Sequence, residues 1–190
     1  MNIILASNSP RRKEILAQFG YSFTVIKSNY KETDSENDPI NTVVKFAKGK
    51  AEDVYNTIKQ EESNNKDIIV LGADTVVYYD GKILGKPRDK VDAENTLKKL
   101  SGKIHKVITG YAVLSDKIKA YGYDVSEVIF NNLTEDIITK YVASGKPLDK
   151  AGSYGVQDGY GLVKKVKGST FNVIGLPIEK ISTILDGIVK

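Results

Sequence analysis

Residues 68–84 read IIVLGADTVVYYDGKIL, and this stretch holds the features that decide the fold. Its first four residues are all apolar, which predicts a buried strand over Ile68–Leu71. Two small residues then lead to Asp74, at what the pattern indicates is the carboxyl end of that strand. Two short apolar segments follow on either side of an Asp-Gly pair at 80–81, the turn that two-residue β-hairpins favour.

The same periodicities extend in both directions along the chain. Further strands are predicted over Asn2–Ala6, Ser22–Lys27, Lys106–Ser115, Lys117–Phe130, Leu162–Val166 and Phe171–Ile174. Helices are predicted from Ser9-Pro10 to Gly20, from Asp38-Pro39 towards Gln60, over Asp89–Ser101 and Thr134–Ser144, and from Pro177 onward. Helices that alternate with strands, some of them clearly antiparallel, predict an α/β layered protein with a mixed sheet. The 190 residues fit one domain, 1–190, or one domain split by a cleft into two lobes.

Composition excludes several classes of protein. The chain has no cysteine, which rules out disulfides and thiolate chemistry and favours a reducing cytoplasm. A single histidine rules out a histidine-rich zinc site, so that a metal would be a hard cation held by oxygen ligands. There is no apolar run of about 18 residues, so no membrane span is predicted. The net charge of +4 is spread diffusely, which fits a small anionic substrate at least as well as a nucleic acid.

The first candidate site is SNSPRR at residues 7–12, between a predicted strand and a helix. Ser9 is the expected N-cap and Pro10 the first helical residue. Backbone N–H groups at a helix start bind anions, but Arg11 and Arg12 carry positive charge at the positive end of the helix dipole. A bound phosphate would turn that repulsion into attraction. The alternative is a solvent-exposed helix start whose arginines pair with nearby acids.

The second candidate is Asp74 in the Gly-Ala-Asp-Thr segment. The carboxyl ends of strands are where open α/β sheets bind ligands, and small residues before Asp74 would let a substrate approach. Asp74 could serve as a general base toward water or as a ligand of Mg²⁺. Capping of the turn into the hairpin is the alternative role. Glu32 and Asp34, in an acidic loop, are further candidate metal ligands.

The remaining candidates are basic or glycine-rich. Lys86 and Arg88 in GKPRD follow the hairpin closely and could reach the same cleft, or could form a basic turn before a helix capped by Asp89. Lys50 is a candidate phosphate contact on a lysine-rich helix. The glycine-rich stretch DKAGSYGVQ at 149–157 suggests backbone close to a ligand, with Gln157 able to read a base edge. His105 is expected to be structural.

Taken together, these segments resemble the Maf family of nucleoside triphosphate pyrophosphatases. The resemblance runs from LASNSPRRKEIL through GADTVV, GKPRD, LSGKIH and PLDKAGSYGVQ to VIGLPIEK, which is nearly the whole chain. It implies an ITPase/Maf-like fold, with a largely antiparallel central sheet flanked by helices and two lobes around a cleft. It also implies hydrolysis of a nucleoside triphosphate to the monophosphate and pyrophosphate with a divalent cation, Mg²⁺ or Mn²⁺.

Carried over by position, the resemblance implies that Asp74 accepts the proton in catalysis and that three residues determine the substrate. Arg11, Thr75 and Gln157 match the pattern of members acting on dTTP and UTP. Two residues depart from this dTTP/UTP pattern. Those members commonly have alanine at the position of Ser153 and glycine at the position of Asp158. Further residues of the family's cleft are matched by Ser7, Arg12, Glu32, Lys50 and Lys86.

Two other functions stay open at this point. One is a pyrophosphatase for modified or purine nucleotides, and the other is a nucleotide-binding regulator of cell division. We expect a nucleoside triphosphate as the partner, with no nucleic acid and no membrane, a cytoplasmic location, and a homodimer as one possible assembly.

Overall fold

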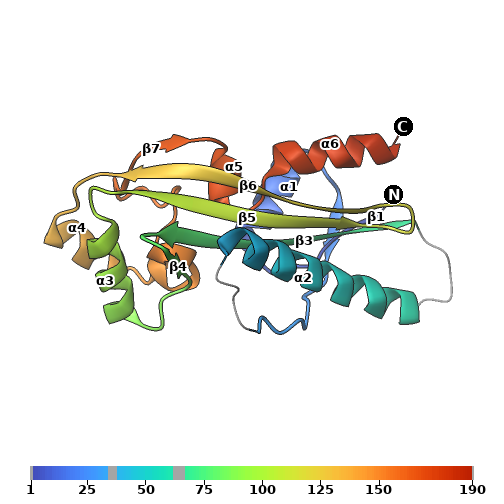
Figure 1. The fold of residues 1–190 in the computed structure, drawn as a ribbon, viewed down its shortest axis with the longest axis horizontal. Coiled ribbons are helices and arrows are strands. Elements are labelled where there is room, and N and C mark those ends of the chain that lie inside the picture. Colours follow the sequence, from blue (N-terminus) through green and yellow to red (C-terminus); the bar gives the residue numbers. More distant parts are fainter. Residues whose placement is uncertain (1, 34–37, 62–66, 190) are drawn as a thin grey trace. The chain divides into compact units, whose positions relative to one another are not determined.

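The computed structural model describes residues 2–33, 38–61 and 67–189, and Figure 1 labels its helices and strands. Contacts divide the chain into two compact units. Unit 1 comprises Met1–Asp74, Thr109–Asp124 and Gly175–Lys190, and unit 2 comprises Thr75–Ile108 and Val125–Ile174. Asp74 is therefore the last residue of the first segment of unit 1.

The described part of the chain contains one sheet of seven strands. Its order is β2-β1-β3-β5-β6-β7, and β4 pairs with β3. The strands are β1 (Asn2–Leu5), β2 (Phe23–Val25), β3 (Ile68–Tyr79), β4 (Lys82–Leu84), β5 (Ile104–Leu114), β6 (Lys119–Phe130) and β7 (Val163–Lys167). Strand β1 is parallel to both β2 and β3, whereas β3–β4 and β6–β7 are antiparallel. The predicted α/β class, with a mixed and largely antiparallel sheet flanked by helices, is confirmed.

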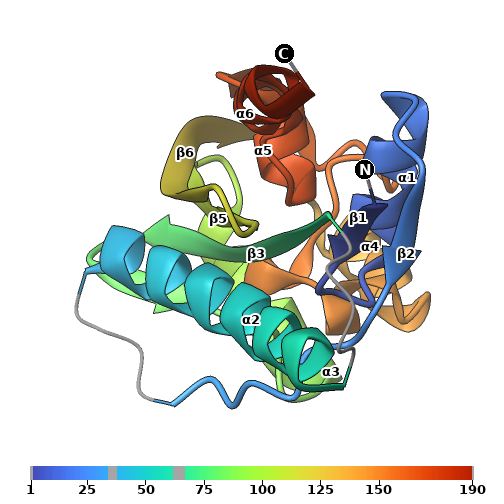
Figure 2. The same cartoon turned by 90° about the vertical axis from the view of Figure 1, so that its right-hand side faces the viewer.

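Unit 1 contains α1 (Pro10–Gln18), α2 (Pro39–Glu61) and α6 (Ile178–Val189). Its core lies where α2 packs along β3, an arrangement that Figure 2 shows from one end. The core is made of small and branched apolar side chains: Ile4, Ala6, Ala47, Ala51, Val54, Ile68, Val70, Ala112 and Leu114. Four of these residues are alanines, and two of them, Ala47 and Ala51, lie on α2. They leave little side-chain bulk on that face of the helix, so the helix can approach the sheet closely.

Unit 2 contains α3 (Lys90–Leu100), α4 (Glu135–Ala143), α5 (Thr170–Ile174) and the two 3₁₀ turns η1 (Lys146–Asp149) and η2 (Ala151–Ser153). Its own core contains larger side chains, among them Leu97, Phe130, Tyr141 and Tyr154. The expected caps are present, because the Asp89 and Thr134 side chains accept hydrogen bonds from backbone N–H groups of α3 and α4. Each unit thus has its own apolar centre.

Two predicted elements are wrong. Strand β3 does not end at Leu71 but continues through the Gly-Ala-Asp-Thr segment to Tyr79, so Asp74 lies in the middle of a strand. Residues Phe171–Ile174 form part of helix α5 rather than a strand. Ser169 Oγ accepts a hydrogen bond from Asn172 N, which caps this short helix, and buried Asn172 Nδ2 donates to Val107 O. These contacts outweigh the strand preference of the apolar sequence.

The hairpin, in contrast, is formed as expected. Asp80 and Gly81 both have positive φ, at 52° and 73°, as the two central residues of a type I′ turn require. No helix in the described ranges is long and apolar enough to cross a membrane.

Candidate active site

The first structural feature of the site is the start of α1. Ser9 occupies the N-cap position and Pro10 begins the helix, as expected, but the Ser9 side chain makes no capping hydrogen bond. Ser7 Oγ instead accepts from Ser9 N at 3.2 Å and from Arg12 Nη1 at 3.0 Å. The first turn contains no acidic side chain, so the positive end of the helix dipole has no local carboxylate to balance it. Ser7, and not Ser9, orders this loop.

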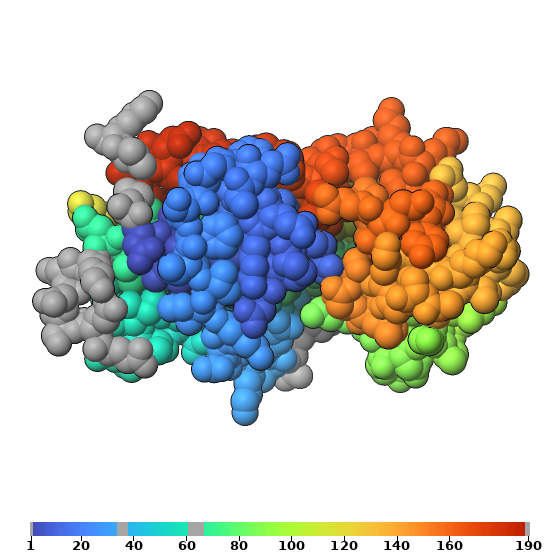
Figure 3. All heavy atoms as spheres, turned by 180° about the vertical axis from the view of Figure 1, so that it is seen from behind, coloured from blue at the N-terminus to red at the C-terminus, as the bar shows by residue number. Residues whose placement is uncertain are grey.

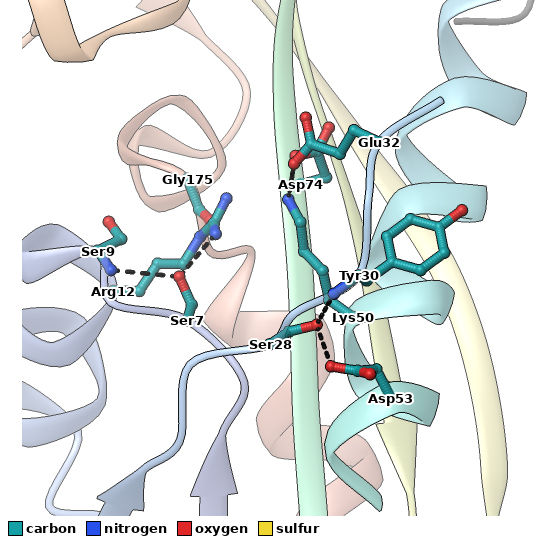
Figure 4. A network of polar contacts seen from close by, with 10 residues as sticks. All are labelled: Ser7, Ser9, Arg12, Ser28, Tyr30, Glu32, Lys50, Asp53, Asp74 and Gly175. Carbon is teal, nitrogen blue, oxygen red and sulfur yellow. Dashed lines mark hydrogen bonds and ion pairs between the residues drawn. The ribbon is translucent and has the colours of Figure 1, made fainter. Parts of the chain in front are cut away.

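Arg12 is held by two segments that are far apart in the sequence. Besides the Ser7 contact, its Nε donates to the backbone oxygen of Gly175 at 2.8 Å (Figure 4). Burial lowers the pKa of Arg12, while the negative charge of Asp74 raises it. Two fixed acceptors leave the guanidinium little rotational freedom. Arg11, in the same turn, is half-buried.

Asp74, Lys50 and Glu32 form the second part of the site. Lys50 Nζ lies 2.7 Å from Asp74 Oδ1 and 2.6 Å from Glu32 Oε1, so one ammonium group joins two carboxylates. The side chains of Asp74 and Lys50 are 13% and 16% exposed, and that of Glu32 is 49% exposed. Burial raises the pKa of Asp74, although the charges of Lys50 and Arg12 act to lower it. A carboxylate with a raised pKa is a better proton acceptor than an ordinary surface aspartate.

The close approach of α2 to β3 explains how these side chains meet. Gly72 and Asp74 are two residues apart on β3 and so point to the same face of the sheet. A Cβ at Gly72 would collide with the backbone oxygen of Ala47 and lie 2.9 Å from Ala51 Cβ, both on α2. The absence of a side chain at Gly72 therefore makes room for α2, whereas the sequence had suggested that it makes room for a substrate. Lys50 lies between Ala47 and Ala51 on that helix, and its side chain reaches Asp74.

The remaining predicted site residues lie in unit 2. Thr75 is half-buried, and Lys86 and Gln157 are exposed. Arg88 is 85% exposed and its Nε lies 3.4 Å from Asp92 Oδ2, at the start of α3. That contact corresponds to the alternative of a basic turn before a capped helix.

The glycine-rich loop that carries Gln157 is fixed by its neighbour Asp158. Tyr141 Oη donates to Asp158 Oδ2 at 2.5 Å and accepts from Gly155 N at 3.0 Å. Lys150 Nζ lies 3.6 Å from the same carboxylate oxygen. Ser153, the other departure from the dTTP/UTP pattern, is fully buried and has a positive φ of 63°. The departure at Asp158 therefore adds a polar anchor beneath the loop.

A divalent cation fits the donor set in unit 1. Magnesium in proteins is commonly bound by one or two carboxylates together with substrate phosphates. Glu32 and Asp74 supply two carboxylates that already share one cationic group, Lys50. Within the described ranges there is no cluster of three or more acidic, histidine or cysteine side chains, so phosphate oxygens would have to complete the coordination. Asp34, the other candidate ligand, lies outside the described residues.

Several residues of this site were not found from the sequence. Gly175 O anchors Arg12 from a position 163 residues away. Asp53, on α2, accepts hydrogen bonds from Ser28 Oγ and Asn29 N in the segment that leads to Glu32. Gly175 belongs to the VIGLPIEK stretch that resembles the family, but that stretch assigned it no role, and no local pattern marks Asp53, because each acts through a contact between distant segments.

Comparison with known proteins identifies the family of the chain. The family model described as Maf-like protein matches residues 2–188. The dTTP/UTP pyrophosphatase of Aquifex aeolicus is 44% identical over 97% of this chain and 94% of its own. The proteins of the same name from Bacillus pumilus and Clostridium tetani are 45% and 43% identical, again over 97% of this chain, and over 95% and 96% of their own. The chain therefore belongs to the Maf-like protein family.

Proposed function

We propose that this protein is a nucleoside triphosphate pyrophosphatase that hydrolyses dTTP and UTP to the monophosphate and pyrophosphate. The observation that carries the proposal is the environment of Asp74. Its carboxylate is largely buried, has a raised pKa, and contacts Lys50, which also holds Glu32. The names of the relatives, which match over nearly the whole chain, supply the reaction and the substrates.

The basic groups account for binding of a polyphosphate. The start of α1, where Ser7 Oγ orders the loop by accepting from Ser9 N and Arg12 Nη1, would bind a phosphate at the positive end of the helix dipole, and Arg12 adds a guanidinium with fixed orientation. We assign Lys50 and Lys86 to the neutralisation of phosphate charge. Phosphoryl transfer depends mainly on such positioning and electrostatic stabilisation.

In the chemical step, Asp74 accepts a proton from a water molecule as its oxygen attacks the α-phosphorus. The bond between that phosphorus and the bridging oxygen to the β-phosphorus breaks, and the bridging oxygen leaves with pyrophosphate. Lys50 keeps the Asp74 carboxylate oriented and in its charged form. A divalent cation, Mg²⁺ or Mn²⁺, held by Glu32 and Asp74 would supply neutralisation of the developing phosphate charge.

Substrate choice is assigned to Arg11, Thr75 and Gln157. The exposed Gln157 side chain offers an amide NH₂ donor group and a carbonyl acceptor to a base edge. We further propose that residues 1–190 act as one catalytic domain in the cytoplasm, since a chain without cysteine suits a reducing compartment. A homodimer stays a prediction.

The test uses purified protein, UTP and Mg²⁺ in water enriched in ¹⁸O. We expect UMP and pyrophosphate, with the label in UMP because attack occurs at the α-phosphorus. UDP and orthophosphate as products, or label in pyrophosphate, would contradict the proposal. A panel of dTTP, UTP, CTP, GTP and inosine triphosphate at equal concentration separates the pyrimidine assignment from a role on modified or purine nucleotides.

A further inference from the structure

The segment that leads to Glu32 is fastened to α2 by a set of contacts that the reaction itself does not require. Asp53 Oδ2 accepts from Ser28 Oγ at 2.8 Å and from Asn29 N at 2.7 Å. Ser28 Oγ in turn accepts from Tyr30 N at 3.0 Å. Figure 4 shows Ser28, Tyr30 and Asp53 close to Lys50, and both Lys50 and Asp53 lie on α2. We call residues 28–30 the strap.

The Tyr30 ring adds an apolar fastening one turn along the helix. A Cβ at Gly49 would overlap this ring and lie 2.7 Å from its Cδ2 atom, so the ring lies directly on the helix backbone. The Phe46 ring is also adjacent, with centroids 6.4 Å apart. Gly49 and Asp53 are four residues apart on one face of α2, so the strap is held at two points on that face.

The strap explains why Glu32 stays on Lys50. An ion pair with a half-exposed carboxylate contributes little by itself, because water screens it and ordering the side chains costs entropy. Only Lys31 separates Tyr30 from Glu32, so fixing the strap restricts the reach of Glu32 before any charge attraction acts. This restriction accounts for the 2.6 Å distance between Glu32 Oε1 and Lys50 Nζ.

We propose that Asp53 is a positioning residue for Glu32: by holding the strap against α2, it sets the location of the Glu32 carboxylate beside Lys50 and Asp74. This inference rests on the proposed function only for its activity readout. Asp53 contacts no reacting group and acts through Glu32 alone. Its effect must therefore disappear when the Glu32 carboxylate is absent.

A double-mutant cycle tests this. Asp53→Ala is expected to lower kcat/KM for UTP about tenfold, the typical effect of losing charge-assisted hydrogen bonds, and Asp53→Asn, which keeps an acceptor, to lower it less. In a Glu32→Gln background, Asp53→Ala is expected to change kcat/KM by less than about twofold. A full tenfold loss in that background would overturn the inference.

Glu52→Gln is the matched control, because Glu52 is the neighbouring acid on α2 and pairs instead with Lys48. It is expected to leave kcat/KM unchanged, and a loss equal to that of Asp53→Ala would overturn the inference by showing that any acid on this helix matters. Should Asp53→Ala fail to fold, Ser28→Ala removes one of the two hydrogen bonds to Asp53, together with the one from Tyr30 N, and enters the same cycle.

A second readout does not depend on turnover. Acylation of Lys50 by acetic anhydride, followed by mass spectrometry, reports how well Glu32 covers this amine. Asp53→Ala and Glu32→Gln are each expected to speed Lys50 labelling several-fold, and the double variant no further. Equal labelling of wild type and Asp53→Ala would overturn the inference. If wild-type protein releases no pyrophosphate, the proposed function fails, while this labelling result still decides the role of Asp53.

Discussion

Asp74 is the residue whose environment most distinguishes it from an ordinary aspartate. Burial raises its pKa, and Lys50 contacts it directly, so it combines basicity with a defined orientation. Asp74→Asn keeps the shape and can still accept a hydrogen bond, but it cannot take a proton. We expect turnover of UTP to fall by at least ~10².

The measurement is single-turnover release of pyrophosphate at saturating UTP, with nucleotide binding followed separately. Binding is expected to persist in Asp74→Asn, since the arginine and lysine contacts to phosphate remain. A variant with near-normal turnover would refute the proton-accepting role and leave Asp74 as a metal ligand or a structural group.

At the level of elements, the site depends on the packing of α2 against β3. Gly72 lets the helix backbone approach the strand, and Lys50 and Asp53 extend from that helix toward Asp74 and the strap. A side chain at position 72 would therefore separate two elements and disturb several contacts together.

Gly72→Ala is expected to lower the free energy of unfolding by about 1–3 kcal/mol, because the new Cβ overlaps the backbone oxygen of Ala47. Gly187→Ala is the control: this glycine lies inside α6 with no atom near its absent Cβ, so alanine is expected to stabilise by about 0.5–1 kcal/mol. Urea denaturation of both variants measures the difference. Equal stabilities would contradict the close-packing argument.

The elements that the sequence predicted correctly are those with local signals. Pro10, the Asp80-Gly81 turn and the Asp89 cap all act within a few residues, and each is found where expected. The end of the strand before Asp74 was predicted wrongly because Gly72 and Ala73 are small residues of the kind found in turns. Their actual role, which is to let α2 pack against the strand, depends on a contact that the local sequence does not reveal. Helix α5 was missed because Asn172 is held by contacts to residues more than 40 positions away.

The site follows the same division. Lys50, Glu32 and Asp74 were all identified by motif or resemblance, and they do lie in contact. Their supports, Gly175 O for Arg12 and Asp53 for the strap, were not identified, because a backbone oxygen or a helical aspartate has no sequence pattern of its own. The roles of Arg11, Thr75, Lys86 and Gln157 stay predictions.

For the whole molecule, the single histidine provides a specific pH dependence of stability. His105 is 2% exposed in the core of unit 2, where its Nε2 lies 2.7 Å from Tyr154 Oη. Burial lowers the pKa of His105 from 6.5 to about 4. The unfolded chain therefore binds a proton below pH 6.5 that the folded chain does not take up until about pH 4. The contribution of His105 to stability is fully present above pH 6.5 and is lost as the pH falls through this window.

We expect the free energy of unfolding to include a loss of about 2 kcal/mol from His105 between roughly pH 7 and pH 5. Asp74 contributes with the opposite sign, because its raised pKa favours proton uptake by the folded state. Urea denaturation of wild type and His105→Gln at both pH values isolates the histidine. Identical pH dependence in the two proteins would show that His105 is not responsible.

The anchor beneath the glycine-rich loop has a consequence for how the sequence can change over time. A Cβ at Gly155 would lie 2.7 Å from Asp158 Oδ2, the oxygen that accepts the hydrogen bond from Tyr141. Alanine at 155 would therefore displace the aspartate from its partner, whereas with glycine at 158 it would meet no carboxylate there. The two positions are coupled: alanine at 155 and the Tyr141–Asp158 contact cannot both be accommodated in this arrangement, and Lys150 Cε, 2.8 Å from the same Cβ position, would have to move as well.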